Sequence, residues 1–240
     1  MAALKPARAP VILAFDVGGS GIKAMRLDPS GKPLGERNRL STPHPARPAA
    51  VLTVMRSLAA SSRPFDKVSV GFPGVVRNGV VWTAANLHSD WVGFDLAKAM
   101  RKALGKPVRV ANDADVQGMG VVKGRGVELV VTLGTGFGSA LFVDGTLVPN
   151  LELGHHPFRR GETYEEQLGE AALDDVGPKR WNRRLGKAIK VLSRVYNFDA
   201  LRIGGGNGRK VTLKLPANVT IVPNAAGLFG GAALWRDTPR

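Results

Sequence analysis

Apolar residues along this chain fall into short runs separated by turns and by longer amphipathic stretches. Six runs have the length and the β-branched content of buried strands, at residues 11–15, 68–72, 108–111, 129–133, 201–203 and 219–222. The stretches between them predict helices at residues 49–60, 95–104, 114–122, 164–173, 179–197 and 225–235. Because strand and helix patterns alternate along the sequence, we predict an α/β protein.

The first strand leads into a glycine-rich turn. Residues 11–15 are followed by Asp16 and by glycines at positions 18, 19 and 21, which lack the Cβ atoms that would keep a backbone away from a phosphate. A P-loop or a dinucleotide-binding fingerprint would continue into a helix. Here the turn Asp28-Pro29-Ser30-Gly31 follows so closely that residues 22–27 can form only a second strand. We therefore predict a phosphate-binding hairpin rather than a P-loop.

The same arrangement recurs in the second half of the chain. Gly134-Thr135-Gly136 separates the strand at residues 129–133 from a predicted strand at 138–143, which turns back into residues 146–148. Both loops could be ordinary turns in a chain with thirty glycines. Their matched contexts instead indicate an internal duplication, with two halves that face one cleft. Further strands are expected at residues 34–40, 75–76 and 80–83.

The composition is that of a globular protein of moderate size. The 240 residues are 44% hydrophobic and 22% charged, which suits one large domain or two lobes. The chain has no cysteine, so disulfides and thiolate metal sites are excluded. No apolar run approaches the roughly 20 residues of a membrane span, and residues 1–10 lack the apolar core of a signal peptide. We expect a cytoplasmic enzyme without a membrane partner.

The formal net charge of +15 is the compositional outlier. Residues 178–214 hold eleven Lys or Arg and one acid, and so supply +10 of this charge. On the predicted helix 179–197, one stripe opposite the apolar face carries Arg183, Lys187, Lys190 and Arg194. Such a stripe can be a solvated helix face, or it can follow a polyanion such as a nucleic acid or inorganic polyphosphate.

Six short motifs occur in order between residues 12 and 235. They are Asp16-Val17-Gly18-Gly19-Ser20-Gly21-Ile22-Lys23, Gly71-Phe72-Pro73-Gly74, Asn112-Asp113-Ala114-Asp115, Leu133-Gly134-Thr135-Gly136-Phe137-Gly138-Ser139-Ala140-Leu141, Glu152-Leu153-Gly154-His155 and Ile203-Gly204-Gly205-Gly206-Asn207. Together they resemble the motifs of the ROK sugar kinases of the actin-like ATPase superfamily, and most closely those of its polyphosphate-dependent glucokinase branch. The resemblance implies an α/β, actin-like ATPase (ribonuclease H-like) fold of two lobes. These would be residues 1–110 and 111–225, with a C-terminal helix in 226–240 that packs back on the first lobe.

The resemblance also implies roles in catalysis and sugar binding. Asp113 matches the catalytic base of the family, which would accept the proton of the attacking hydroxyl. The matching sugar ligands are Asn112, Asp113, Glu152, His155 and Glu165, with Asn86 as a further candidate. Without the resemblance, Asn112 or Asp113 could simply cap the following helix, and Asp115 is expected to be structural.

The phosphate donor would lie against the glycine loops. The residues that match its binding site are Asp16, Gly18, Gly19, Ser20, Gly21, Lys23, Thr135, Gly136, Gly205, Gly206 and Asn207. Asp16 would also hold Mg²⁺ through water, because hard cations prefer carboxylate oxygens and keep their waters. The alternative is that Asp16 has a structural role. Typical ROK kinases carry a cysteine-rich zinc loop after the fifth motif, whereas residues 159–169 here resemble the zinc-free replacement of the polyphosphate branch, so no structural zinc is expected.

These expectations combine into one hypothesis. The protein would transfer a phosphoryl group from inorganic polyphosphate, with ATP as a second candidate donor, to the 6-hydroxyl of glucose, and relatives suggest a homodimer. An ATP-only hexokinase of the same fold would form product with ATP alone. A non-catalytic sugar or polyanion-binding protein would bind glucose without consuming a donor. The charge alone suggests a nucleic-acid-binding protein, but no recognition motif supports a nucleic acid partner.

Overall fold

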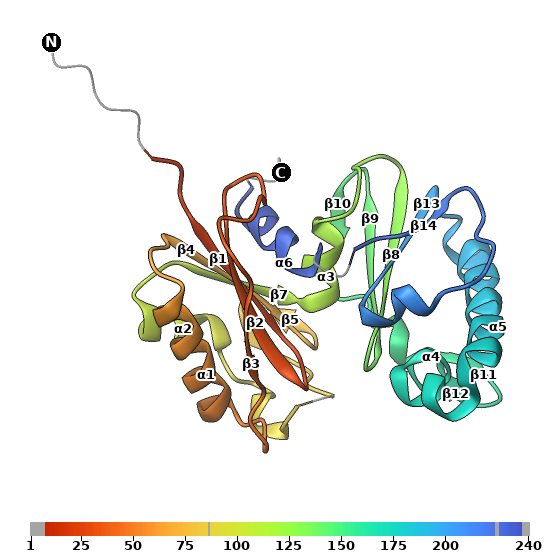
Figure 1. Ribbon diagram of the computed structural model, residues 1–240, viewed down its shortest axis with the longest axis horizontal. Coiled ribbons are helices and arrows are strands. Elements are labelled where there is room, and N and C mark those ends of the chain that lie inside the picture. The colour runs from red at the N-terminus through yellow and green to blue at the C-terminus, as the bar shows by residue number, and fades with distance from the viewer. Residues whose placement is uncertain (1–7, 86, 224–225, 237–240) are drawn as a thin grey trace, which may run out of the picture.

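Two five-stranded β-sheets form the framework of the protein (Figure 1). The computed structural model describes residues 8–85, 87–223 and 226–236. The strands of the first sheet are β1 (Ile12–Val17), β2 (Gly21–Leu27), β3 (Asn38–Ser41), β4 (Lys67–Phe72) and β7 (Val108–Asn112). The strands of the second sheet are β8 (Val127–Leu133), β9 (Phe137–Val143), β10 (Thr146–Val148), β13 (Ala200–Gly204) and β14 (Val219–Ile221).

The two sheets have the same topology. Their strand orders are β3-β2-β1-β4-β7 and β10-β9-β8-β13-β14. In each sheet the first three strands in chain order are antiparallel neighbours, and two parallel strands follow on the other side of the first strand. The repeat predicted from the two hairpins therefore extends over both entire sheets.

Helices connect the strands and cover the sheets. The α-helices are α1 (Pro48–Ser61), α2 (Leu96–Leu104), α3 (Asp113–Met119), α4 (Tyr164–Leu168), α5 (Glu170–Tyr196) and α6 (Ala226–Phe229). Single 3-10 turns occur at η1 (Ser89–Trp91), η2 (Leu153–His155), η3 (Gly206–Lys210) and η4 (Gly230–Trp235). Two small hairpins complete the described elements: β5 (Val76–Arg77) with β6 (Val80–Val81), and β11 (Pro157–Arg159) with β12 (Glu162–Thr163).

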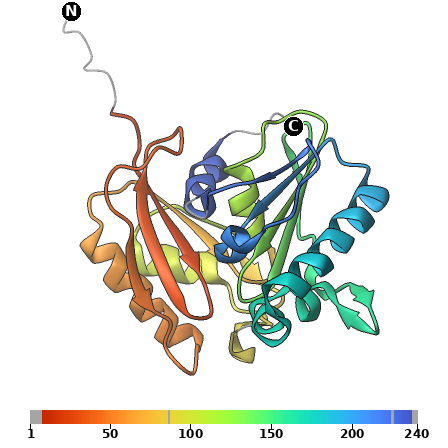
Figure 2. The ribbon, with the colours of Figure 1, turned by 45° about the vertical axis from the view of Figure 1, so that its right-hand side comes forward.

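The layers alternate between helices and sheets (Figures 1 and 2). Helices α1 and α2 pack on the outer face of the first sheet around the fully buried Trp91, and α4 and α5 pack on the outer face of the second sheet around Trp181. Between the sheets lie α3 and the α6–η4 segment, which contact one another. Gly230 permits this contact, because a Cβ there would collide with the carbonyl of Val116. These layers hold the N-terminus of α3 between the two sheets.

The C-terminal segment returns to the first sheet. Leu228 and Ala232 pack against Ile12 and Leu27 on the inner face of this sheet. Nearby, the indole of Trp235 donates a hydrogen bond of 2.9 Å to the hydroxyl of Ser69.

The limits of the two lobes stay a prediction. Among the described residues, no helix combines the length and the apolar character needed to cross a membrane.

The structure differs from the sequence-based elements in the connections. The helix predicted at 164–173 breaks at Gly169, where a Cβ would lie 2.9 Å from the carbonyl oxygens of Glu165 and Thr135. Helix α5 is interrupted at Gly177, whose φ of 72° no helical residue adopts, so its second part begins at Pro178, next to the predicted start at 179. In place of one strand predicted at 34–40, a bridge of Pro33 to Leu27 is followed by the strand β3 at 38–41, and both pair with β2.

Candidate active site

One cleft of about 740 Å³ collects the sequence-predicted residues of both sheets. The predicted sugar and donor residues that line it are Asp16, Gly18, Gly19, Ser20, Gly21, Lys23, Asn112, Asp113, Thr135, Gly136, Glu152, His155, Glu165, Gly205, Gly206 and Asn207. Asn86 lies outside the described residues. The cleft therefore brings together residues that are distant in the chain, and both glycine loops take part in it.

The two glycine loops have matching hydrogen bonds. The N–H of Gly18 donates to the carbonyl of Gly21 at 3.0 Å, and the N–H of Gly134 donates to that of Gly136 at 3.1 Å. Within the described part of the chain, the N–H groups at the tips, at positions 19 and 20 and at 135 and 136, make no such bond. The amides at the tips are therefore available to phosphate oxygens.

Two further residues brace the second loop. The side-chain amide of Asn207 donates to the carbonyl of Gly134 at 3.3 Å, so its role in this structure is to hold the loop. Gly205 has a φ of 83°, and a Cβ there would collide with the carbonyl of Leu133. Only glycine fits at this position without strain, because it combines a positive φ with a close approach to β8.

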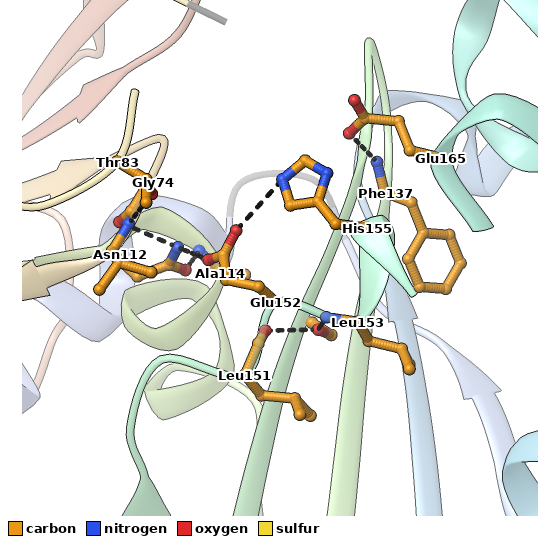
Figure 3. Close-up of polar contacts among 12 residues, drawn as sticks. Gly74, Thr83, Asn112, Ala114, Phe137, Leu151, Glu152, Leu153, His155 and Glu165 are labelled. Atoms are coloured by element: carbon orange, nitrogen blue, oxygen red, sulfur yellow. Dashed lines mark hydrogen bonds and ion pairs between the residues drawn. The ribbon is translucent and has the colours of Figure 1, made fainter. Parts of the chain in front are cut away.

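Asn112 and Asp113 stand at the end of β7 and the beginning of α3. The side-chain oxygen of Asn112 caps α3 by accepting the N–H groups of Ala114 at 2.8 Å and Asp115 at 3.2 Å. Its amide group donates to Glu152 at 3.1 Å and to the carbonyl of Gly74 at 3.2 Å. Asn112 thus performs the capping role considered from the sequence and also reaches across to Glu152, which precedes η2 in the second half of the chain (Figure 3).

Asp113 is half-buried beside this cap, and one of its oxygens accepts the N–H of Ala114 at 2.8 Å. Burial raises the pKa of Asp113 to about 7, with further increases from the negative charges of Asp16, Glu152 and Asp115. The close approach of β4 fixes this position, since a Cβ on Gly71 would lie 3.3 Å from the Cα of Asp113. A carboxyl group with a pKa near neutrality can exchange a proton at ordinary pH, as a general base must.

Glu152, His155 and Glu165 come from the second half of the chain. Glu152 lies between Asn112 and His155, with 3.5 Å between its Oε2 and the His155 Nε2 (Figure 3). Burial raises the pKa of Glu152, the Glu165 charge adds to this increase, and His155 opposes it. Glu165 accepts the N–H of Phe137 at 3.2 Å. These groups provide acceptors and one imidazole for the hydroxyls of a polar ligand.

Asp16 and Lys23 face each other across the first hairpin. The Lys23 ammonium donates to Asp16 Oδ2 at 2.8 Å, and both side chains line the cleft. In the residues that the structure describes, no three side chains of His, Cys, Asp or Glu come close enough to form a metal site. A divalent cation would therefore need ligands beyond Asp16, such as donor phosphates and water.

Several cleft residues escaped the sequence interpretation. They are Arg39, His44, Gln117, Glu170 and Arg209. Arg39 reaches the tip of the first hairpin from β3 and donates to the carbonyl of Ser20 at 3.2 Å. Each of these residues is isolated in the sequence and belongs to no motif. The only available signal for Arg39 was its place on a strand next to the phosphate hairpin.

The predicted basic stripe divides in the structure. Arg183 and Lys187 line a second cavity of about 370 Å³, together with basic residues of β11–β12 and α5. Lys190 and Arg194 lie further along α5 and do not line this cavity. The positive charge is therefore more concentrated than a stripe along one helix.

Sequence comparison places the chain among sugar kinases. Residues 12–165 match the model of the ROK family. The polyphosphate glucokinase of Mycobacterium tuberculosis (strain CDC 1551 / Oshkosh) is 33% identical over 235 residues, covering 91% of this chain and 88% of that protein. The polyphosphate glucokinase of Mycobacterium leprae (strain TN) is 31% identical, with coverage of 91% and 72%.

Structural comparison agrees. The inorganic polyphosphate/ATP-glucomannokinase from Arthrobacter sp. strain KM superposes with a TM-score of 0.86 and 35% identity, covering 95% of this chain and 98% of that chain. A ROK family glucokinase from Streptomyces griseus, in complex with glucose and AMPPNP, gives a TM-score of 0.78 at 18% identity, with coverage of 93% and 98%. The second likeness concerns the fold alone. Together these structures confirm the α/β sugar kinase fold expected from the sequence.

Proposed function

This chain belongs to the ROK family, and we propose that it is a polyphosphate-dependent glucokinase. It transfers the terminal phosphoryl group of inorganic polyphosphate to the 6-hydroxyl of glucose, with ATP as a second donor. The observation that carries the proposal is the position of Asp113, which lines one cleft together with both glycine loops and has a pKa near 7. The names of the mycobacterial and Arthrobacter relatives support the donor and the sugar.

Glucose binds on the side of the cleft formed by the second half of the chain. The carboxylates of Glu152 and Glu165 accept hydrogen bonds from its hydroxyls, and His155 binds beside them. The amide of Asn112, already bonded to Glu152, orients that carboxylate. In this arrangement the 6-hydroxyl faces Asp113.

Asp113 acts as the general base. It accepts the proton of the 6-hydroxyl, whose oxygen forms a bond to the terminal phosphorus of the donor. The bond from this phosphorus to the bridging oxygen breaks, and the polyphosphate leaves one unit shorter with that electron pair. The transition state of such transfers is largely dissociative. The protein therefore contributes mainly by positioning the two reactants and by neutralising the negative charge on the phosphoryl oxygens. The amides at the tips of the two glycine loops, with Lys23 and Arg39, bind the donor oxygens.

Mg²⁺ fits this site as a partner of the donor rather than as a resident ion. Asp16 offers a hard carboxylate ligand in the cleft, and its charge is among the causes that raise the pKa of Asp113. One carboxylate together with phosphate oxygens and water is a usual environment for Mg²⁺. When bound there, Mg²⁺ neutralises charge on the transferring phosphate.

The test is formation of glucose 6-phosphate with long-chain polyphosphate and, in parallel, with ATP. We expect product with polyphosphate, and loss of product when EDTA removes Mg²⁺. Product with ATP but none with polyphosphate would replace the proposal by an ATP-only hexokinase. No product with either donor, although glucose binds, would indicate a non-catalytic sugar-binding protein. A homodimer and a cytoplasmic location stay predictions.

A further inference from the structure

A second cavity, of about 370 Å³, lies outside the cleft and is almost entirely basic. We call it the basic cavity. Its lining consists of Val176 and six cationic residues: Arg159, Arg160, Arg180, Arg183, Arg184 and Lys187. The acidic residues of the nearby first part of α5, Asp174 and Asp175, are not part of this lining. The hairpin β11–β12 and helix α5 thus direct their positive charges into one space.

Two of the arginines are held in place by one buried residue. Gln167 is 2% exposed, and its side-chain oxygen accepts a hydrogen bond of 2.9 Å from Arg159 Nη1. The carbonyl of the same residue accepts a bond of 3.3 Å from Arg184 Nη1. Because both acceptors are neutral, these hydrogen bonds orient the guanidinium groups without pairing them with a negative charge. These two arginines are therefore fixed in orientation for an anion, while the other four cations are exposed.

Among the residues that the structure describes, no carboxylate forms an ion pair with the cations of the basic cavity. Like charges that share a cavity repel one another, and a bound polyanion would relieve the repulsion. A solvated helix face, by contrast, spreads its charges outward. Here Arg159 and Arg160 come from a hairpin and close the cavity against α5.

The basic cavity is close to the cleft. Glu170 lines the cleft and Val176 lines the basic cavity, and six residues of helix separate them by about 9 Å. On α4, Glu165 lines the cleft while its neighbour Gln167 supports the basic cavity. A linear anion bound at one end in the cleft can therefore extend to the basic cavity, whereas a short anion cannot occupy both.

We propose that the basic cavity is a second binding site for inorganic polyphosphate, which holds the chain away from its reacting end. The inference rests on the proposed function, because it assumes a polyphosphate donor in the cleft. With this second site, the affinity of the protein for polyphosphate increases with the length of the polyphosphate. Long chains bind to both sites at once, while tripolyphosphate and ATP are too short for the basic cavity to strengthen their binding in the cleft.

The experiment compares two double variants that change the net charge equally. Arg183→Glu/Lys187→Glu reverses two exposed cations of the basic cavity. Arg56→Glu/Lys102→Glu reverses two exposed cations of α1 and α2, far from both cavities, and serves as the matched control. For each variant and the wild type, the binding of long-chain polyphosphate and of tripolyphosphate is measured by titration. KM for each donor and kcat are measured by glucose 6-phosphate formation.

We expect the first variant to raise Kd and KM for long-chain polyphosphate about tenfold at low salt, since each exposed charge contributes roughly threefold to binding. Its kcat and its KM for tripolyphosphate should match those of the control. Equal affinities for long-chain polyphosphate in the two variants would overturn the inference and leave the proposed function intact. Absence of turnover with polyphosphate in the wild type would refute the proposed function instead, and the titration would then still test the site. Tighter binding of single-stranded RNA than of polyphosphate, lost in the first variant, would assign the basic cavity to nucleic acid and overturn the proposal.

Discussion

Lowering the pH from about 8 to about 6 should remove most of the activity, because this change protonates Asp113. Burial and the neighbouring carboxylates raise the pKa of this group to about 7. At about pH 8 roughly nine-tenths of the molecules then carry the ionised base, and at about pH 6 roughly one-tenth. The value of kcat/KM for glucose should therefore fall about tenfold between these pH values.

The cause of the raised pKa can be tested with the same assay. After burial, Asp16 is the largest contributor to the pKa of Asp113. Asp16→Asn removes that negative charge, so the pH at which kcat/KM falls to half its maximum should move to a lower value. This shift does not depend on any change in the maximal kcat/KM, which is the plateau of the profile. The plateau itself should fall, because Asp16 is also the proposed Mg²⁺ ligand. The midpoint pH of the profile and its maximal kcat/KM are thus separate measurements.

The assay couples glucose 6-phosphate to its dehydrogenase, at constant ionic strength and with glucose and the donor both well below their KM values, so that the profile reports the free enzyme. The stability of the coupling enzyme at each pH is checked with added glucose 6-phosphate. A profile that is flat from about pH 5.5 to about pH 8 would refute the assignment of the base. So would an unchanged limb in Asp16→Asn.

Three further predictions concern residues around the site. Arg39→Ala should raise KM for the phosphate donor about tenfold, because the guanidinium of Arg39 lies at the tip of the first glycine hairpin. The control variant Arg37→Ala should leave this KM unchanged. Equal donor KM values in the two variants would exclude a role of Arg39 in donor binding. Glu128→Ala should lower the free energy of unfolding by about 3 kcal/mol in urea denaturation, since it leaves the buried Arg202 unpaired and frees the N–H groups of residues 123 and 124; a loss below about 1 kcal/mol would contradict this. Burial raises the pKa of Asp115 from 3.8 to about 7, so the folded protein retains a proton that the unfolded chain loses, and unfolding free energy falls as pH rises through this range. Asp115→Asn should make that fall shallower, and an unchanged pH dependence would argue against it.

The hairpins could be predicted from the sequence because local chemistry determines them. Asp28 accepts the N–H groups of Ser30 and Lys32, each at 2.9 Å, so the turn that excluded a P-loop is formed by neighbouring residues. The cap at Asn112 is equally local. The residues of the six motifs meet at one cleft because five of the motifs lie at strand ends and the remaining one, Glu152–His155, lies at η2. Their roles in binding and catalysis stay predictions.

The remaining features depend on contacts between distant residues. Arg39, Gln117 and Arg209 line the cleft only because the sheets bring their elements together. Likewise, the stripe predicted on α5 could not reveal the basic cavity, since Arg159 and Arg160 belong to another element and Arg159 is oriented through Gln167. The break at Gly169 also has a tertiary cause, since the carbonyl of Thr135 approaches it. Helical periodicity carries no information about such approaches.

The central claim is that Asp113 is the base of a phosphoryl transfer from polyphosphate to glucose. The most direct test measures glucose 6-phosphate formation from long-chain polyphosphate by Asp113→Asn, with glucose binding measured by calorimetry on the same preparation. Asparagine can still accept the N–H of Ala114, so the fold of the site is kept. The account predicts a rate about a hundredfold or more below that of the wild type, with glucose affinity retained. Wild-type turnover in Asp113→Asn would contradict it.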